Sequence, residues 1–193
     1  KIYSASKLLA ENLIMSFCNK NKIKYAIARV FNLYGNNDEF SIISKVIKAY
    51  RKKHFFVLNN DGSAIRDFIS YDEVSKIYKD ILTSNKSEVI DVGTGHGTQI
   101  KDIIKLLDKK KINLKRKYLD EIQFSVSDIN EHNSNLSYNN FNYYLKKQLK
   151  LKYLPQINKY KSEKNNIFKE NIKGAIIYGA GNAGKQIYDL LSK

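Results

Sequence analysis

Residues 25–35 read YAIARVFNLYG, and this stretch decides the fold that the sequence predicts. Residues 25–31 are mostly apolar, as expected of a strand that is buried on both faces of a sheet. Gly35 and the polar residues around it predict a loop over residues 32–39. The stretch therefore predicts a buried strand that ends at a loop.

The segments on both sides of this strand predict helices. Apolar side chains recur at helical spacing over residues 3–19 and again over residues 40–50. Short apolar runs predict further strands at residues 55–58, 65–69 and 89–92. Because strands alternate with helices, the sequence predicts an α/β fold with a mostly parallel sheet.

Two later helices are expected between and after these strands. Asp72 is a candidate N-cap, since an aspartate side chain accepts hydrogen bonds from the first free N–H groups of a helix. The glycine-rich segment 93–97 predicts a loop, and residues 99–107 then repeat the helical pattern.

The chain is strongly basic, with a formal net charge of +15 over 193 residues. Its lysines gather over residues 109–117 and 146–173, so a nucleic-acid partner is one interpretation. No zinc finger, RNP-type motif or clear helix-turn-helix accompanies these lysines, and this favours a solvated surface over a nucleic-acid interface.

The sequence also bears on three further features, which are disulfides, membrane spans and metal sites. Cys18 is the single cysteine, which excludes an internal disulfide and is expected in a reducing cytoplasm. No apolar run reaches the roughly 18 residues of a membrane span. His54, His96 and His132 show no spacing typical of metal ligands, so the sequence predicts no metal site.

Tyr3 and Lys7 are the first pair with a chemical interpretation. Their i, i+4 spacing places both side chains on one face of a helix, where the ammonium group favours the phenolate form of the tyrosine. A tyrosine tuned in this way can act as a general base near neutral pH. The spacing alone carries little information, because it recurs at Tyr143–Lys147 and Tyr160–Lys164.

Four motifs, in one order, give this pair its context. They are YSASKLLAE at residues 3–11, ARVFNLYG at 28–35, DGSAIRDFI at 61–69 and DVGTG at 91–95. Over about residues 1–155 the sequence resembles the NAD-dependent epimerase/dehydratase family of the extended short-chain dehydrogenase/reductases. Asp91 stands where that family usually has asparagine. The resemblance implies the C-terminal half of a Rossmann-like doubly wound fold with its small substrate-binding subdomain.

The resemblance also implies residue roles. Tyr3 would be the catalytic base and acid, and Lys7 would hold the nicotinamide ribose of NAD and tune the tyrosine. Phe31 would lie beside the nicotinamide, and Asn32 would bind a nucleoside-diphosphate sugar near its phosphates. Arg66 would bind the diphosphate, a task that suits the fixed charge and forked geometry of guanidinium.

Structural alternatives remain for two of these residues. Arg66 could instead form a surface ion pair with Asp67 or Asp72, which lie near it in the sequence. Asn32 taken alone could be an ordinary turn residue. The setting of both residues within the motifs favours the binding roles.

The family's glycine-rich NAD-binding loop and the residues that separate epimerases from 4,6-dehydratases lie upstream of the tyrosine. We therefore expect this chain to be a fragment whose NAD-binding half precedes Lys1, inactive by itself, from an enzyme of surface polysaccharide or glycan biosynthesis. The alternative is a non-catalytic remnant that binds sugar nucleotides without the cofactor. By resemblance, a homodimer is also expected.

A second glycine motif stands near the C-terminus. Gly179, Gly181 and Gly184 follow the apolar run at residues 174–178 and open a helical pattern, as in dinucleotide-binding loops. The segment resembles the first strand and turn of nucleoside-diphosphate-sugar dehydratases of the capsule and flagellin-glycosylation type. A tight turn without a ligand is the alternative.

These observations divide the chain into three parts. Residues 1–155 would form the catalytic-helix and sugar-nucleotide-binding part. Residues 156–172 are polar and lack periodicity, so they predict a linker. Residues 173–193 would be the truncated first β-α unit of a second Rossmann-like domain.

Overall fold

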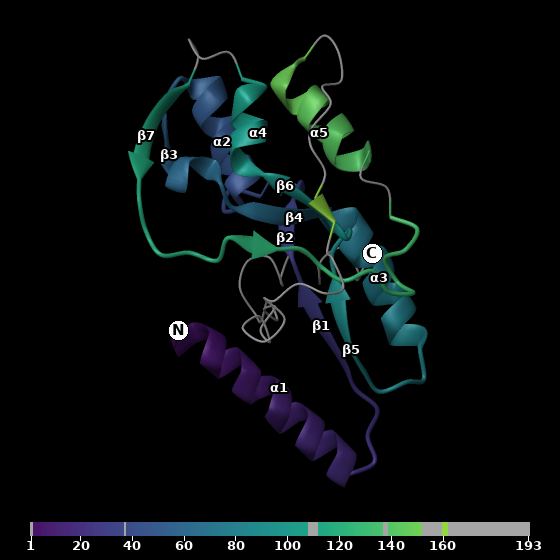
Figure 1. Ribbon diagram of the computed structural model, residues 1–193. Coiled ribbons are helices and arrows are strands. Elements are labelled where there is room, and N and C mark those ends of the chain that lie inside the picture. Colours follow the sequence, from purple (N-terminus) through teal and green to yellow (C-terminus); the bar gives the residue numbers. More distant parts are fainter. Residues whose placement is uncertain (1, 37, 108–111, 137–138, 152–159, 162–193) are drawn as a thin grey trace.

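The computed structural model describes residues 2–36, 38–107, 112–136, 139–151 and 160–161. Within these residues helices alternate with strands, and the strands form three separate sheets (Figure 1). The predicted α/β fold with parallel strand pairs is confirmed.

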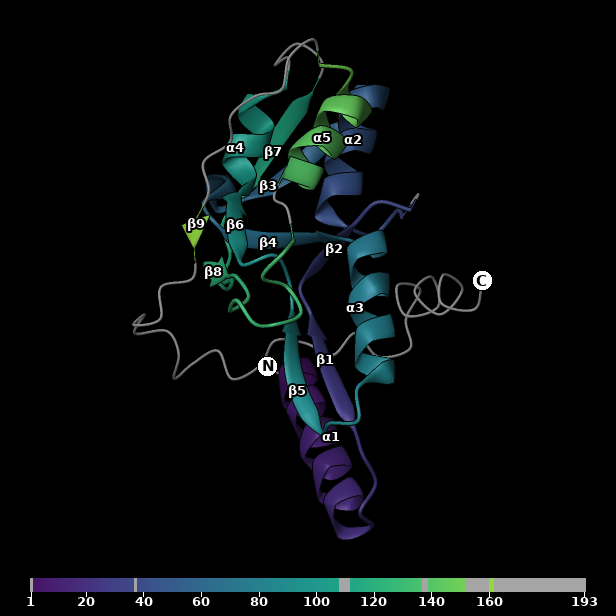
Figure 2. The same cartoon turned by 90° about the vertical axis from the view of Figure 1, so that its right-hand side faces the viewer.

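The first helix and two parallel strands form one end of the structure. Helix α1 spans Ile2–Lys20, and strand β1 spans Ala26–Val30, close to the prediction for both. Strand β1 pairs in parallel with β5, which spans Glu88–Val92, so that Ala26 lies opposite Glu88. The helix runs alongside the two strands and in the direction opposite to β1 (Figures 1 and 2).

The central sheet is built around β4, which spans Ile65–Ser70. It pairs in parallel with β2, Asn32–Tyr34, and antiparallel with β6, His96–Gln99. The prediction of a loop over residues 32–39 was therefore wrong at its start. The predicted loop over residues 93–97 was likewise wrong at its end, because β6 begins at His96. Both differences have the same cause. Residues without a strand pattern of their own become strands here because they pair with β4.

Two very short strands complete this sheet. Strand β8, Phe124–Ser125, pairs in parallel with β4, and β9, Tyr160–Lys161, pairs antiparallel with β6. Strand β9 falls inside the range predicted as a linker. Residues 156–159 and 162–193 lie outside the described residues, and they include all of the predicted second unit. The division into domains therefore stays a prediction.

A third sheet has two parallel strands. Strand β3, Phe55–Asn59, pairs with β7, Asn113–Lys117. A 3-10 turn, η1, spans Asn60–Gly62 and leads from β3 into β4.

Three helices enclose the larger of the two hydrophobic cores. They are α2, Ile42–Lys52, α4, Ile100–Lys105, and α5, Asn139–Leu149, which lie together at one end of the structure (Figure 1). Helix α4 is shorter than the predicted helix over residues 99–107, because Gln99 belongs to β6 and the helix ends at Lys105. Phe141 of α5 is fully buried and stacks on Phe68 of β4, with 4.9 Å between the ring centroids.

Polar caps fix where α2 begins. The side chain of Ser41 accepts a hydrogen bond from the N–H of Ser44, and the buried carboxylate of Asp38 accepts from the N–H groups of Phe40 and Ser41. The helix therefore starts at Ile42 rather than at Phe40, whose side chain is exposed.

Helix α3, Tyr71–Thr83, packs on the second core, which it shares with β1, β4 and β5. Its N-cap is Ser70, and the prediction of Asp72 was wrong. Ser70 accepts from the N–H of Glu73, and the Glu73 carboxylate accepts from the N–H of Ser70, which forms a capping box. With this start Tyr71 falls in the first turn, where its side chain is buried in the core.

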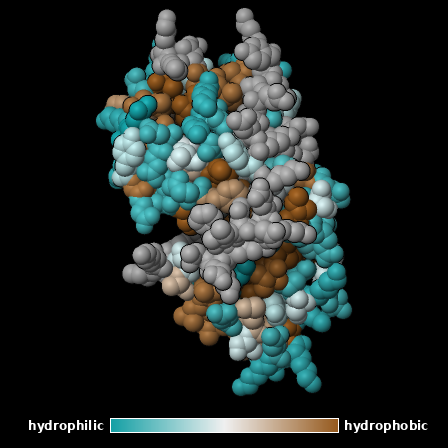
Figure 3. Space-filling model, viewed as in Figure 1, coloured by the Kyte–Doolittle hydropathy of each residue, from teal (hydrophilic) through white to brown (hydrophobic). Residues whose placement is uncertain are grey.

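The apolar side chains of α1 face solvent in this structure. Leu9, Leu13 and Phe17 are each about 60% exposed, and apolar atoms are visible over this helix in the space-filling view (Figure 3). Among the described residues no helix is long and apolar enough to cross a membrane.

Candidate functional site

One ion pair anchors α1 to β1. The guanidinium of Arg29 donates to both carboxylate oxygens of Glu11, with a shortest distance of 2.7 Å. Glu11 is only 2% exposed, and it is the one buried side chain of α1 between residues 4 and 20. The hydrogen bond to Glu11 raises the pKa of Arg29, which burial alone would lower. This contact therefore holds the middle of α1 against β1.

The anchor directs the first turns of α1 toward the carboxyl end of β1. Lys7 precedes Glu11 by four residues and therefore shares its helix face. Four helical residues advance about 6 Å, and two strand residues advance about 6.6 Å. Because helix and strand run in opposite directions (Figure 2), we expect Lys7 near the level of Phe31 when Glu11 is at Arg29. Tyr3 belongs to the same helix, but its side chain lies outside the described residues.

We expect Glu11→Gln to lower the free energy of unfolding by about 2 kcal/mol, because it leaves the half-buried guanidinium of Arg29 with only Asp91, at 4.0 Å, as a charged partner. Urea unfolding followed by circular dichroism measures this change. Glu39→Gln is the matched control, since Glu39 is 71% exposed and its pair with Lys48 should contribute close to nothing. Equal stability of the two variants would contradict the anchoring role.

Phe31 and Asn32 follow β1 without a break. Phe31 is buried at 8% exposure, and its N–H donates to the carbonyl of Val92 at 3.0 Å. The side-chain amide of Asn32 donates to the carbonyl of Asp67 at 3.0 Å, which joins β2 to β4. Asn32 is therefore part of a strand pair rather than a free turn residue.

Arg66 lies on β4 directly before Asp67, so it is close to the strand pairing that holds Asn32. Its side chain is 17% exposed and pairs with the carboxylate of Glu121 at 3.4 Å. The alternative partners, Asp67 and Asp72, are not the ones found. Burial lowers the pKa of Arg66 and Glu121 opposes this shift, but guanidinium stays charged at neutral pH.

The sequence did not reveal the buried polar centre at Asp67, whose backbone carbonyl accepts from Asn32. Its carboxylate is fully buried and accepts hydrogen bonds from the N–H and hydroxyl of Thr94, the N–H of Gly95, and the N–H and hydroxyl of Ser127. Burial raises the pKa of Asp67, and the bonds from Thr94 and Ser127 oppose this. One side chain thereby joins β4 to the glycine-rich loop and to the segment after β8.

Gly93 fits this centre because it has no side chain. A Cβ atom at Gly93 would lie 2.5 Å from a carboxylate oxygen of Asp67 and 2.5 Å from the hydroxyl of Ser127. Gly95 has a φ of +70°, in the left-handed region that favours glycine. The glycines of the motif at residues 91–95 therefore allow the backbone to pack directly against the buried carboxylate of Asp67.

A separate pocket of about 350 Å³ lies between α2 and α5. It is lined by side chains of both charge signs, including Asp38, Glu39, Lys48 and Arg51. Lys7, Phe31, Asn32 and Arg66 do not line it. The pocket is therefore distinct from the site at the ends of β1 and β2.

The predicted site residues fall into two groups. Asn32 and Arg66 lie on the paired strands β2 and β4, and Phe31 directly precedes β2. Lys7 lies on the helix that Glu11 anchors to β1. Gly179, Gly181 and Gly184 lie outside the described residues, so their role stays a prediction.

Parts of this chain are similar in sequence to known proteins. It is 27% identical over 113 residues to the dTDP-L-rhamnose 4-epimerase of Burkholderia thailandensis, covering 55% of this chain and 31% of that protein. It is 35% identical over 94 residues to the CDP-abequose synthase of Salmonella typhimurium, covering 46% of this chain and 31% of that protein. The chain thus spans about a third of the length of these curated relatives.

Solved structures agree with the fold. The UDP-N-acetylglucosamine 4-epimerase of Methanobrevibacter ruminantium M1, in complex with UDP-N-acetylmuramic acid, superposes with a TM-score of 0.62 and 26% identity. The match covers 76% of this chain and 51% of that chain. A dTDP-glucose 4,6-dehydratase from Bacillus anthracis in complex with NAD has a TM-score of 0.60 at 15% identity, covering 81% and 47%, and supports the fold alone.

Relatives and solved structures are therefore nucleotide-sugar epimerases, dehydratases and related synthases, with a Rossmann-like fold in the structures. The motifs that contain Tyr3, Lys7, Asn32 and Arg66 all fall within residues 3–69. Over residues 1–93 the chain matches the model of the NAD dependent epimerase/dehydratase family.

Proposed function

We propose that this chain is the sugar-nucleotide-binding part of an NAD-dependent nucleotide-sugar epimerase or dehydratase. The observation that carries the proposal is the placement of Asn32 and Arg66 on neighbouring strands, beside the end of β1 toward which Lys7 is directed. The family match over residues 1–93 and the names of the relatives support it.

The residues fit a nicotinamide cofactor on one side of this site. Phe31 supplies an apolar wall, and Lys7 supplies a cation on the facing helix. NAD, when bound here, would supply a reversible hydride acceptor. Tyr3 takes the proton of the sugar hydroxyl as the hydride leaves and gives it back later, while Lys7 favours the phenolate and holds the ribose.

Arg66 is proposed to bind the diphosphate of the substrate, a nucleoside-diphosphate sugar. The pairing with Glu121 means that phosphate oxygens must displace a carboxylate before they reach the guanidinium. A bidentate phosphate contact is stronger than this single ion pair at 3.4 Å, so the exchange favours the ligand.

Further proposals concern the whole protein. We place it in the cytoplasm, as a homodimer, in surface polysaccharide or glycan biosynthesis, and we expect its catalysis to require the NAD-binding part that its relatives possess. Gly179, Gly181 and Gly184 are proposed to open a second nucleotide-binding unit of the capsule and flagellin dehydratase type. The resemblance of the sequence supports these points.

Substitution of Arg66 tests the binding role. We expect Arg66→Ala to weaken binding of UDP-glucose or another nucleoside-diphosphate sugar by roughly 10- to 100-fold, because a charged hydrogen-bond partner of the phosphates is lost. Titration calorimetry of the chain measures the affinity. Arg51→Ala is the matched control, since Arg51 is exposed on α2 and contacts Gln148 of α5.

The partner of Arg66 gives a second comparison. Glu121→Gln removes the competing carboxylate and should tighten binding of the same nucleotide sugar. Unchanged affinity in Arg66→Ala would exclude the diphosphate role of this residue. Binding by the chain, without turnover when NAD and substrate are supplied to the full-length protein, would support the non-catalytic remnant instead.

A further inference from the structure

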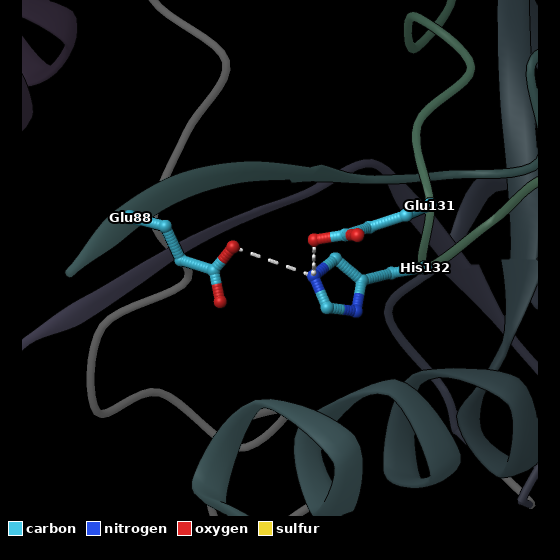
Figure 4. Close-up of side chains that lie close together, drawn as sticks. All are labelled: Glu88, Glu131 and His132. Atoms are coloured by element: carbon cyan, nitrogen blue, oxygen red, sulfur yellow. Dashed lines mark hydrogen bonds and ion pairs between the residues drawn. The ribbon is translucent and has the colours of Figure 1, made fainter. Parts of the chain in front are cut away.

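Three metal-ligating side chains meet at the end of the β1–β5 sheet opposite the candidate site. Glu88 is the first residue of β5, whereas Glu131 and His132 lie in the turn over residues 131–135 (Figure 4). One ligand atom from each residue lies within 4.8 Å of the other two. The sequence spacing concealed this cluster, because Glu88 and His132 are 44 residues apart.

The distances around the imidazole suit a shared cation better than hydrogen bonds. Nε2 of His132 is 3.4 Å from Oε2 of Glu88 and 3.6 Å from Oε1 of Glu131. Both distances exceed the usual range of N–H···O bonds, about 2.7–3.2 Å. Ligand atoms at the corners of a tetrahedral zinc site, with bonds of about 2.0–2.1 Å, are about 3.3–3.4 Å apart.

A second observation comes from the inner carboxylate. Oε1 of Glu88 is buried and has no hydrogen-bond partner among the described residues. The side chains of Glu88 and His132 are 18% and 13% exposed, whereas Glu131 is 64% exposed. Glu88 and His132 are thus mostly buried, and one oxygen of Glu88 lacks a partner among the described residues. The exposed Glu131 side chain can move to complete the coordination when an ion enters.

The turn that carries His132 is held in place by its own hydrogen bonds. The side chain of Asn130 donates to the carbonyl of Asp91 at 2.9 Å, which fixes the turn to β5. The N–H of His132 donates to Oδ1 of Asn130, and the buried side chain of Asn133 donates to the carbonyl of Asp128. The imidazole is therefore presented to Glu88 by a preformed backbone.

We propose that Glu88, Glu131 and His132 form a zinc site that fastens the turn over residues 131–135 to the start of β5. One imidazole nitrogen and two carboxylates select a first-row transition ion over Mg²⁺ or Ca²⁺, which prefer all-oxygen sites. The two carboxylates balance the charge of the ion. Lys86, which is 3.3 Å from Oε1 of Glu131, competes for the outer ligand.

Calorimetric titration of the metal-free 193-residue chain with zinc chloride tests the site, with magnesium chloride as the contrast. We expect one zinc ion per chain and no saturable magnesium binding. His132→Ala and Glu88→Gln should each weaken zinc binding roughly tenfold or more. His54→Ala, which removes an exposed histidine, should leave the affinity unchanged, and Lys86→Ala should raise it.

Absence of saturable zinc binding to the wild-type chain, or equal affinity in wild type and His132→Ala, would overturn the proposal. Should the variants fail to fold, the wild-type chain alone decides the question. Zinc should protect His132 from modification by diethyl pyrocarbonate, read by peptide mass spectrometry, while His54 stays reactive. Equal modification of His132 with and without zinc would also overturn it.

Discussion

Asp67→Ala is expected to lower the free energy of unfolding by about 4 kcal/mol, among the largest effects of any single substitution in this chain. The carboxylate accepts from five donors supplied by Thr94, Gly95 and Ser127. Alanine removes both carboxylate oxygens at once, although the N–H of Gly95 keeps the hydroxyl of Ser127 as an acceptor. Buried N–H groups left without a partner each cost about 1–3 kcal/mol, and the two hydroxyls recover part of the loss by rotating.

Urea unfolding followed by circular dichroism measures the loss, with the slope of the transition checked for two-state behaviour. Asp80→Asn is the control, because Asp80 is exposed on α3 and its change should stay within about 0.5 kcal/mol. A loss of less than 1 kcal/mol in Asp67→Ala would mean that water replaces the carboxylate without cost, and that Asp67 does not organise the site.

Phe141→Ala should cost about 4 kcal/mol as well, for a different reason. The ring is 1% exposed, stacks on Phe68 and meets Tyr34 edge-on with 5.0 Å between centroids. Alanine would leave a cavity between α5 and β4, and the rigid strand cannot close it. Thermal and urea unfolding of the variant measure the cost.

Tyr143→Ala on the same helix is the matched control, since its side chain is 66% exposed and the change should stay within about 0.5 kcal/mol. The comparison separates packing from helix propensity, because both substitutions place alanine in α5. Similar losses in the two variants would show that α5 contributes as an isolated helix and does not complete the core.

The sequence predicted those elements whose signal is local. The buried run of β1 and the apolar spacing of α1, α2 and α3 each lie within a single segment, and each of these elements is found close to its predicted place. Strand β2 has three residues and no pattern of its own, so its pairing with β4 could not be read locally. The choice of Ser70 over Asp72 depended on Tyr71, which is buried only if the helix begins there.

The candidate site divides in the same way. Lys7, Asn32 and Arg66 stand in motifs whose order along the chain points to them. Asp67 stands in one of those motifs too, but its importance comes from donors 27 to 60 residues away. The partner of Arg66, Glu121, is 55 residues distant. Periodicity and spacing carry no information about such contacts.

The distance between Asp67 and its donors also bears on the order in which the chain folds. During synthesis β2 and β4 are made before Thr94, and Ser127 is the last of the donors to Asp67 to be made. Until then the carboxylate keeps its water, and closing the intervening loops has an entropic cost that must be met first. The middle of the central sheet should therefore become dry only after Ser127 has been synthesised, 60 residues after Asp67.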